Sequence, residues 1–223
     1  MSETEIIRVR SGEQLDLDHL EPWLHTHLPD TNGPLTLRQF GGGHANLTYL
    51  LQFGDTEYVL RRPPIGPIAP TAHDMRREHH VLKRLGDAFP LAPHSYALCT
   101  DPAIIGVDFH IMERRQGIVV RRELPTHLAD KPDLNCRIGE MLVDVLADLH
   151  QVNPETVGLG DLGRPEEFVK RQLTGWALRW HQAKDREVPD VDRILRKLEA
   201  TIPKPQATTL LHNDYKLDNL IVA

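Results

Sequence analysis

The residues with the clearest chemical potential lie near the end of the chain, in the segment LLHNDYKLDNLIV. His212, Asp214 and Asn219 form the pattern H-x-D-x-x-x-x-N there, between two short apolar runs. A carboxylate and an amide five positions apart on one loop can meet at a single site. A chain of this composition contains such a three-residue pattern by chance in roughly a few per cent of cases, so its context must decide.

Lys216, two positions after Asp214, adds a fourth match to the catalytic loop of protein kinases. In such a loop the Asp accepts or orients the hydroxyl of the phosphoryl acceptor, and the Asn holds magnesium. The segment therefore indicates phosphoryl transfer.

Other chemistries have weaker support. The chain has 13 His, and His25/His27 or the His73, His79 and His80 set could suggest a zinc site and a metal-dependent hydrolase. These sets are interspersed with Arg and have neither an HExxH pattern nor Cys partners, so we do not favour a metal centre. The chain also lacks a Gly-x-Ser-x-Gly motif and a recognisable Cys nucleophile motif.

Composition places the chain among ordinary globular proteins. Its 223 residues are 40% apolar and 26% charged, which excludes collagen-like, coiled-coil and disordered classes. The formal net charge of -6 argues against a general nucleic-acid or anionic-membrane partner. Two distant Cys and the absence of a signal-peptide core or a long apolar run predict a cytoplasmic protein that is neither secreted nor membrane-spanning.

The first part of the chain is rich in predicted strands. Leucines at helical spacing predict an amphipathic helix within an N-terminal extension over 1–34. A capping pattern from Thr71 to Asp74 predicts a helix over 72–86. Alternating β-rich runs predict a five-stranded antiparallel sheet with strands at 35–40, 47–53, 56–62, 94–99 and 107–113.

The second part is predicted to be helical. Apolar residues recur at helical spacing from 136 onward, and further helices are expected at 165–184 and 190–202, before a short strand at 207–211. The result is an α+β chain with a boundary near 114–118, where Gln116-Gly117 is a candidate hinge. We assign 35–115 to an N-terminal lobe and 116–223 to a partial C-terminal lobe.

Five segments together resemble the aminoglycoside phosphotransferase family of kinase-like enzymes: GGGHANLTYLL, YVLRRPP, REHHVLKRL, IMERRQG and HNDYKLDN. They look most like the branch that includes kinase-like domains fused to acyl-CoA dehydrogenases, and the resemblance covers about residues 15–223. It implies a protein-kinase-like two-lobe fold, with ATP and Mg²⁺ as cofactors and a small-molecule hydroxyl compound as substrate.

By this resemblance several N-lobe residues bind the nucleotide. Gly41, Gly42 and Gly43 would let backbone N–H groups approach the phosphates, although a plain hairpin loop is the alternative. His44 and Asn46 could touch phosphate, but we favour a role in finishing the turn. The strand period places Val59 and Arg61 on one face, Val59 against adenine and Arg61 at the position of the phosphate-binding Lys of protein kinases.

Glu78 is predicted to be the partner of Arg61. It projects from the otherwise apolar stripe of its helix, and an inward carboxylate needs a cation. The kinase-like arrangement supplies Arg61, which the pair would aim at the phosphates. A solvated edge-strand Arg61, or pairing of Glu78 with Arg76 or Arg77, is the alternative.

The resemblance also assigns the remaining site residues. Backbone groups from Glu113 to Arg115 would hydrogen-bond the adenine edge, Asp214 would act on the acceptor hydroxyl, Lys216 would offset phosphoryl charge, and Asn219 would bind magnesium. Asn213 stands where the antibiotic kinases usually have Gly, and Asn tolerates the left-handed backbone.

One part of the family pattern is missing. The second metal-binding Asp would follow the catalytic loop, but the sequence stops at Ala223, so we expect a truncated product in which Asp218 is a weak stand-in. A non-catalytic kinase-like fragment that at most binds nucleotide is therefore the alternative function. Arg114, Arg115, Arg121 and Arg122 hint at a neutral or anionic acceptor rather than a polycation. The sequence does not determine the oligomeric state.

Overall fold

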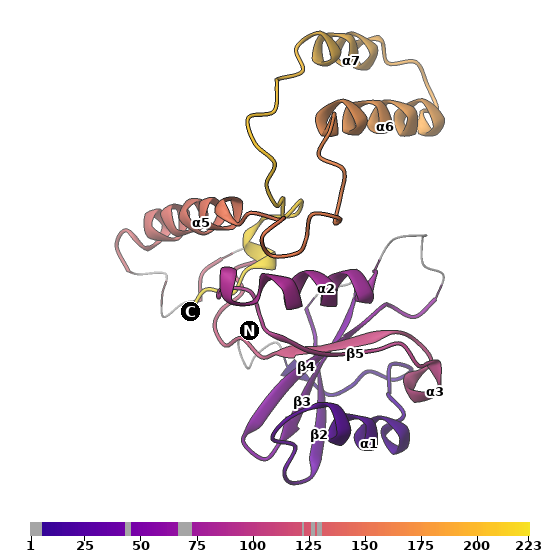
Figure 1. Ribbon diagram of the computed structural model, residues 1–223, viewed down its shortest axis with the longest axis vertical. Helices are drawn as coiled ribbons and strands as arrows, with labels where there is room; N and C mark the ends of the chain where they lie inside the picture. The colour runs from indigo at the N-terminus through magenta and orange to yellow at the C-terminus, as the bar shows by residue number, and fades with distance from the viewer. Residues whose placement is uncertain (1–5, 43–45, 67–72, 122, 126–127, 129–130) are drawn as a thin grey trace. The chain divides into compact units, whose positions relative to one another are not determined.

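The computed structural model describes residues 6–42, 46–66, 73–121, 123–125, 128 and 131–223. It contains an antiparallel sheet with strand order β1-β2-β3-β4-β6-β5 (Figure 1). The strands are β1 (Ile6–Ile7), β2 (Leu35–Phe40), β3 (Leu47–Phe53), β4 (Thr56–Arg62), β5 (Ser95–Cys99) and β6 (Phe109–Glu113).

All five predicted strands are present, and the sheet contains a sixth. Ile6 pairs with Phe40 and Ile7 with Gln39, so β1 extends the sheet at the β2 edge. Two residues are too few to show the alternating pattern from which strands are recognised, so the predicted number of five was one too low.

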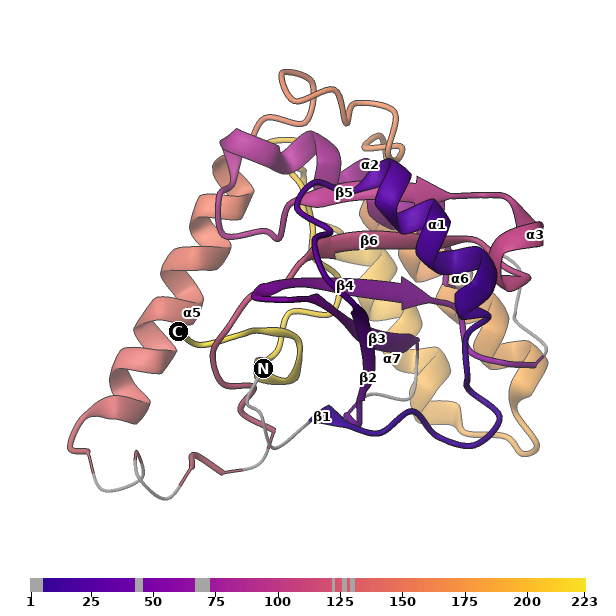
Figure 2. The same ribbon diagram turned by 90° about the horizontal axis from the view of Figure 1, so that it is seen from below.

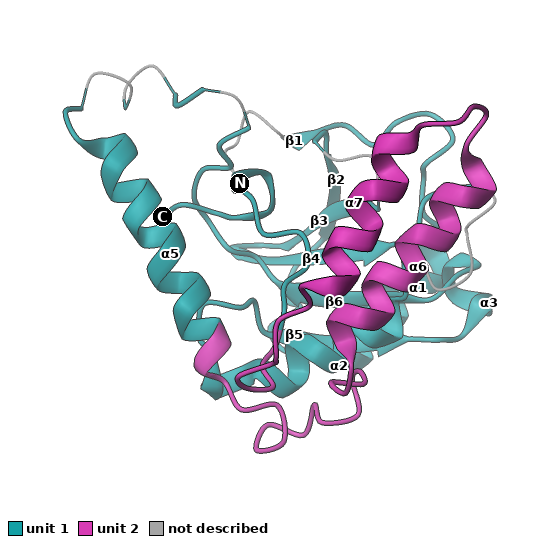
Figure 3. Cartoon of the chain, turned by 90° about the horizontal axis from the view of Figure 1, so that it is seen from above, with its two compact units in different colours: residues 1–149, 211–223 teal, residues 150–210 magenta. Residues whose placement is uncertain are grey.

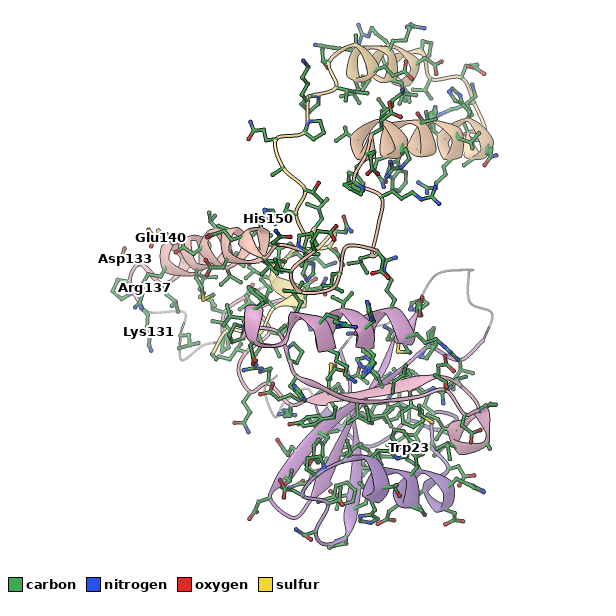
Figure 4. All side chains as sticks on the ribbon, viewed as in Figure 1. Trp23, Lys131, Asp133, Arg137, Glu140 and His150 are labelled. Atoms are coloured by element: carbon green, nitrogen blue, oxygen red, sulfur yellow. The ribbon has the colours of Figure 1, made fainter. Side chains whose placement is uncertain are left out.

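One face of the sheet is covered by α1 (Leu17–His27), which Asp16 caps by accepting a hydrogen bond from the His19 N–H. Its buried Leu20 and Leu24 join a core with sheet residues such as Tyr49 and Leu60. The helix lies across the near side of the sheet in Figure 2, and Trp23, labelled in Figure 4, meets Phe109 edge-on with ring centroids 5.0 Å apart. The N-terminal helix therefore shares the apolar core of the sheet.

The opposite face is covered by α2 (Met75–Leu85), which packs against β5 and β6 (Figure 1). The helix begins later than the predicted residue 72, because the Asp74 side chain accepts from the Arg77 N–H at 3.0 Å and acts as the N-cap. Thr71, the other residue of the predicted capping pattern, lies outside the described residues. The 3-10 turn η2 (Gly86–Ala88) follows α2, whereas the short helix α3 (Pro102–Ile105) packs against α1.

The chain forms two compact units, residues 1–149 with 211–223 and residues 150–210 (Figure 3). The first unit contains the sheet, α1, α2, most of α5 (Leu134–Gln151) and the 3-10 turn η3 (Leu217–Asn219). The second contains α6 (Phe168–Ala183) and α7 (Pro189–Ala200), which pack against each other. The three predicted helices of the second half are confirmed.

The strand predicted at 207–211 is wrong. These residues form no strand; instead the Thr209 hydroxyl donates to the carbonyl oxygen of His150, and Leu210 is buried. A β-rich composition becomes a strand only where a neighbouring strand supplies hydrogen-bond partners, which this segment lacks among the described residues.

Among the described residues, no helix combines the length and apolar character needed to cross a membrane.

Candidate active site

The segment from His212 to Asn219 brings its polar side chains together. The Asn219 Nδ2 donates to the Asp214 Oδ2 at 2.7 Å and to the Asp214 carbonyl oxygen at 2.8 Å. The Lys216 Nζ lies 3.4 Å from the Asp214 Oδ1. Both carboxylate oxygens of Asp214 therefore face a donor, and the predicted meeting of carboxylate and amide at one site is confirmed.

These contacts hold Asp214 in its ionised form. The hydrogen bond from Asn219 is the main cause that lowers the pKa of Asp214 below its ordinary value, and the charge of Lys216 acts in the same direction. The Asp214 side chain is 66% exposed. A solvent-accessible carboxylate that stays ionised at neutral pH can orient a hydroxyl group and accept its proton as the hydroxyl reacts.

The backbone of this segment follows the predicted conformation and is anchored on a helix. Asn213 has φ of 65°, the left-handed conformation that Asn tolerates better than most side chains. The Tyr215 hydroxyl donates to the carbonyl oxygen of Leu142 in α5 at 2.7 Å, and its ring meets His212 edge-on with centroids 5.5 Å apart. Tyr215 thus anchors the loop to α5 directly after Asp214, and His212 packs against the anchored ring.

A second anchor joins the end of this segment to the chain after the sheet. Ile118 and Val222 form an antiparallel bridge with backbone hydrogen bonds of 2.8 and 2.9 Å. Gly117 has φ of +142°, and a Cβ there would lie 2.5 Å from the Val222 carbonyl oxygen. The predicted hinge residue is therefore a contact point where only glycine fits.

The ion pair predicted between Arg61 and Glu78 forms. The Arg61 Nη1 of β4 lies 2.9 Å from the Glu78 Oε1 of α2, with the side chains 34% and 25% exposed. As the strand period predicted, Arg61 shares a sheet face with Val59, and this is the face that α2 covers. A charge pair that is partly shielded from water holds the guanidinium in a defined direction.

Sequence reasoning missed a third member of this cluster. His110 of β6 is fully buried, and its Nε2 lies 3.5 Å from the same Glu78 Oε1. Burial would raise the pKa of Glu78, but His110 and Arg61 together outweigh it and hold the pKa below the ordinary value. The signal for His110 was its position between Phe109 and Ile111 in the buried first part of the strand FHIME, where an imidazole needs a partner.

Val59 lies in an apolar cluster, whereas the glycine turn is approached by arginine side chains. Val59 is 2% exposed and packs with Phe40 and Leu50 in a small apolar cluster on the α2 side of the sheet. The Gly41 carbonyl oxygen accepts from the Arg10 Nη2 at 2.9 Å. A Cβ on Gly42 would lie 2.3 Å from the Arg121 Nη2, so the missing side chain lets a guanidinium approach the turn.

Parts of the predicted phosphate loop lie outside the described residues, namely Gly43 and His44. Asn46 is described, and its Oδ1 lies 2.6 Å from the His73 Nδ1. This contact connects the end of the turn to the residue that precedes the N-cap of α2.

Glu113 and Arg115 are engaged with the chain itself. Their side chains pair at 3.1 Å, and Arg115 donates to the carbonyl oxygens of Pro90 and Ala92 at 2.7 and 2.9 Å. The Glu113 backbone N–H donates to the His94 carbonyl oxygen at 2.8 Å. This N–H is therefore already used, and the adenine contacts that stay as predictions are those of the Glu113 carbonyl oxygen and of the Arg114 and Arg115 backbone.

The histidine sets make ordinary polar contacts. His79 Nδ1 lies 2.8 Å from the Ser95 hydroxyl oxygen, His25 Nδ1 lies 2.9 Å from that of Thr31, and His27 donates to the Trp23 carbonyl oxygen. In the described part of the chain, no three His, Cys, Asp or Glu side chains are grouped so that they could hold a metal ion.

Comparison with known proteins agrees with this geometry. Residues 36–223 match the model of the phosphotransferase enzyme family. The chain is 33% identical to mouse (Mus musculus) acyl-CoA dehydrogenase family member 10 over 96% of its length, and 32% identical to chicken (Gallus gallus) acyl-CoA dehydrogenase family member 11, also over 96%. It spans 20% and 28% of the lengths of these two relatives.

A solved structure has the same fold. It is that of a Ralstonia eutropha JMP134 protein assigned as an aminoglycoside phosphotransferase, with a TM-score of 0.79 and 32% identity. The match covers 94% of this chain and 61% of that one. The sheet with its covering helices and the helical second half thus have a protein-kinase-like fold.

Proposed function

Since the chain belongs to the phosphotransferase enzyme family, we propose that it transfers the γ-phosphoryl group of ATP to a hydroxyl group of a small molecule. The observation that carries the proposal is the arrangement around Asp214, where Asn219 and Lys216 each face one oxygen of an ionised, accessible carboxylate. The Arg61–Glu78 pair belongs to the same compact unit.

In the transfer step Asp214 acts on the acceptor. Its carboxylate orients the hydroxyl group and takes up the proton as the hydroxyl oxygen forms a bond to the γ-phosphorus. The bond between the γ-phosphorus and the bridging oxygen breaks, and ADP carries away the bonding electron pair. The ammonium group of Lys216, 3.4 Å from Asp214, offsets the negative charge that gathers there.

The same cluster has the donor types that magnesium prefers. Mg²⁺ binds oxygen ligands and is usually held by one or two protein groups together with phosphate oxygens. The amide oxygen of Asn219 is such a ligand, and its NH2 group donates to Asp214 at 2.7 Å, which keeps the amide beside the proposed site of transfer. Bound there, the ion would neutralise charge on the phosphates.

Arg61 is the proposed contact to the ATP phosphates. A guanidinium carries five N–H donors in a planar fork, so it can hold Glu78 with one edge and a phosphate with another. The pair with Glu78 fixes its direction, and correct orientation before the reaction lowers the barrier.

The acceptor class is proposed from charge. Arg114, Arg115 and Arg121 follow β6, and Arg121 approaches Gly42 of the glycine turn. Cations in this region disfavour a polycationic acceptor and favour a neutral or anionic hydroxyl compound.

The test compares the chain with Asp214→Asn. We expect ATP with Mg²⁺ to raise the melting temperature of both proteins in a saturable way, because a ligand that binds the native state stabilises it. The unchanged chain should form ADP slowly from ATP, with water or a hydroxyl compound as acceptor, and D214N should not. Asp148→Asn, an exposed change on α5, is the control. ATP without effect on the folded chain, or D214N with unchanged ADP release, would overturn the proposal.

A further inference from the structure

We infer that His110 is a positioning residue that supports Glu78 from the buried side, so that Glu78 keeps Arg61 directed towards phosphate. The inference rests on the proposed function, because it assigns a role within the proposed nucleotide site. It concerns a residue that the sequence pattern did not single out.

The sheet register places the three residues together. Arg61 of β4 and His110 of β6 are directly opposite each other in the antiparallel ladder, so their side chains leave the same face of the sheet. Glu78 reaches them from α2, and one oxygen, Oε1, lies 2.9 Å from the Arg61 Nη1 and 3.5 Å from the His110 Nε2. One carboxylate oxygen thus faces a guanidinium and an imidazole nitrogen on neighbouring strands.

Burial separates the roles of the two donors. The His110 ring has no exposed surface, whereas the Arg61 side chain is 34% exposed. Arg61 can therefore meet a ligand from solvent, and His110 cannot. His110 acts only through the group that it faces.

The ring has no stronger attachment in the described part of the chain. Neither ring nitrogen of His110 has a hydrogen-bond partner there within normal geometry, and the Glu78 carboxylate is the anion facing Nε2. Buried polar atoms without a full hydrogen bond are rare in folded proteins and call for an explanation. A movement of Glu78 towards the ring by a few tenths of an ångström would complete the hydrogen bond.

Phosphate binding supplies the reason for such a movement. When phosphate oxygens compete for the guanidinium of Arg61, the attraction between Arg61 and Glu78 weakens, and Glu78 would otherwise be left partly buried without a full partner. The His110 N–H then keeps the carboxylate in place, and the carboxylate keeps Arg61 directed. His110 therefore stabilises the nucleotide-bound arrangement more than the free one.

The neighbouring contact between α2 and the sheet offers a matched control. His79 directly follows Glu78 in α2, and its Nδ1 lies 2.8 Å from the hydroxyl oxygen of Ser95. Ser95 is buried, as His110 is. Ser95→Ala removes a polar contact from the same interface without touching Glu78 or Arg61. It reports what a purely structural loss does.

The experiment measures the dissociation constant for ATP with Mg²⁺ in the whole 223-residue chain. His110→Met removes the ring donors, and His110→Gln places an amide N–H near the position of Nε2 at almost the same side-chain length. We expect H110M to weaken ATP binding about five- to tenfold and H110Q to restore most of it. S95A should lower the melting temperature but leave ATP affinity unchanged.

A double-mutant cycle with Glu78→Gln tests whether His110 acts through Glu78. We expect H110M to have little further effect on ATP affinity in the E78Q background. ATP affinity of H110M equal to that of the unchanged chain, or an H110M effect that persists in full with E78Q, would overturn the inference. Failure of the unchanged chain to bind ATP would instead overturn the proposed function.

A readout without nucleotide keeps the inference testable on its own. Side-chain ¹³C NMR can follow the titration of Glu78 in the free chain. We expect a higher Glu78 pKa in H110M than in the unchanged chain, and a smaller increase in H110Q. An identical Glu78 titration in all three proteins would contradict the contact on which the inference depends.

Discussion

Tyr215 and Leu142 lie 73 positions apart in the sequence and are joined by a hydrogen bond of 2.7 Å from the phenol to the helix carbonyl oxygen. The bond fastens the residue directly after Asp214 to α5. It makes the position of the proposed catalytic carboxylate depend on a helix rather than on the loop alone.

Tyr215→Phe removes this hydrogen bond and keeps the ring. We expect a loss of about 1 kcal/mol in unfolding free energy and slower ADP release with unchanged ATP affinity, because the loop loses its anchor. Urea unfolding and steady-state kinetics measure both. Tyr58→Phe is the matched control, since the Tyr58 hydroxyl donates to the Pro29 carbonyl oxygen in the core; equal kinetic losses in the two variants would contradict a local role for Tyr215.

Lys216→Met should shift the acid limb of the pH profile. The Asn219 hydrogen bond is the larger cause and the Lys216 charge a further cause of the lowered Asp214 pKa. The proposed role of Asp214 requires its ionised form, so we expect activity to fall as the pH drops through this pKa. Loss of the Lys216 charge raises the pKa and moves the acid limb of kcat/KM to higher pH. Lys216→Arg should leave the limb in place, and a limb unmoved in K216M would exclude this coupling.

Glu78→Gln should change how stability depends on pH. The folded-state pKa of Glu78 lies below the ordinary value of 4.5, because burial, the largest single effect, raises it but is outweighed by His110 and Arg61 together. A lowered folded-state pKa contributes stability above the unfolded-state pKa, and this stability is lost as the pH falls through the folded-state pKa. The stability advantage of the unchanged chain over E78Q should therefore shrink below about pH 4.5. Urea unfolding at a series of pH values tests this, and curves that stay parallel would refute it.

Gly117→Ala should loosen the bridge between Ile118 and Val222. The new Cβ would lie 2.5 Å from a backbone oxygen, and the φ of +142° is unfavourable for any side chain. We expect a loss of about 1–3 kcal/mol in unfolding free energy. Gly139→Ala is the opposite case, since it lies inside α5 with open space around it and should gain about 0.5–1 kcal/mol. Equal changes in thermal stability in G117A and G139A would show that the close contact at Gly117 does not require glycine.

The sequence by itself determined the local elements and the residue types of the proposed catalytic segment. The strands at 35–40, 47–53 and 56–62 and the helices of the second half follow from side-chain periodicity, which depends on neighbours a few positions apart. Asp214 and Asn219 meet because one short turn joins them. The sequence predicts the pair of Arg61 and Glu78 because an inward carboxylate requires a cation and the resemblance to the family indicates which one.

Only the tertiary structure decided which distant residues share a contact. The register of β4 against β6 places His110 opposite Arg61, and Tyr215 reaches Leu142 across 73 positions. The strand β1 exists because Phe40 and Gln39 offer it backbone partners, and 207–211 forms none because such partners are missing among the described residues. These outcomes depend on strand pairing and helix placement, which no local pattern of residues contains.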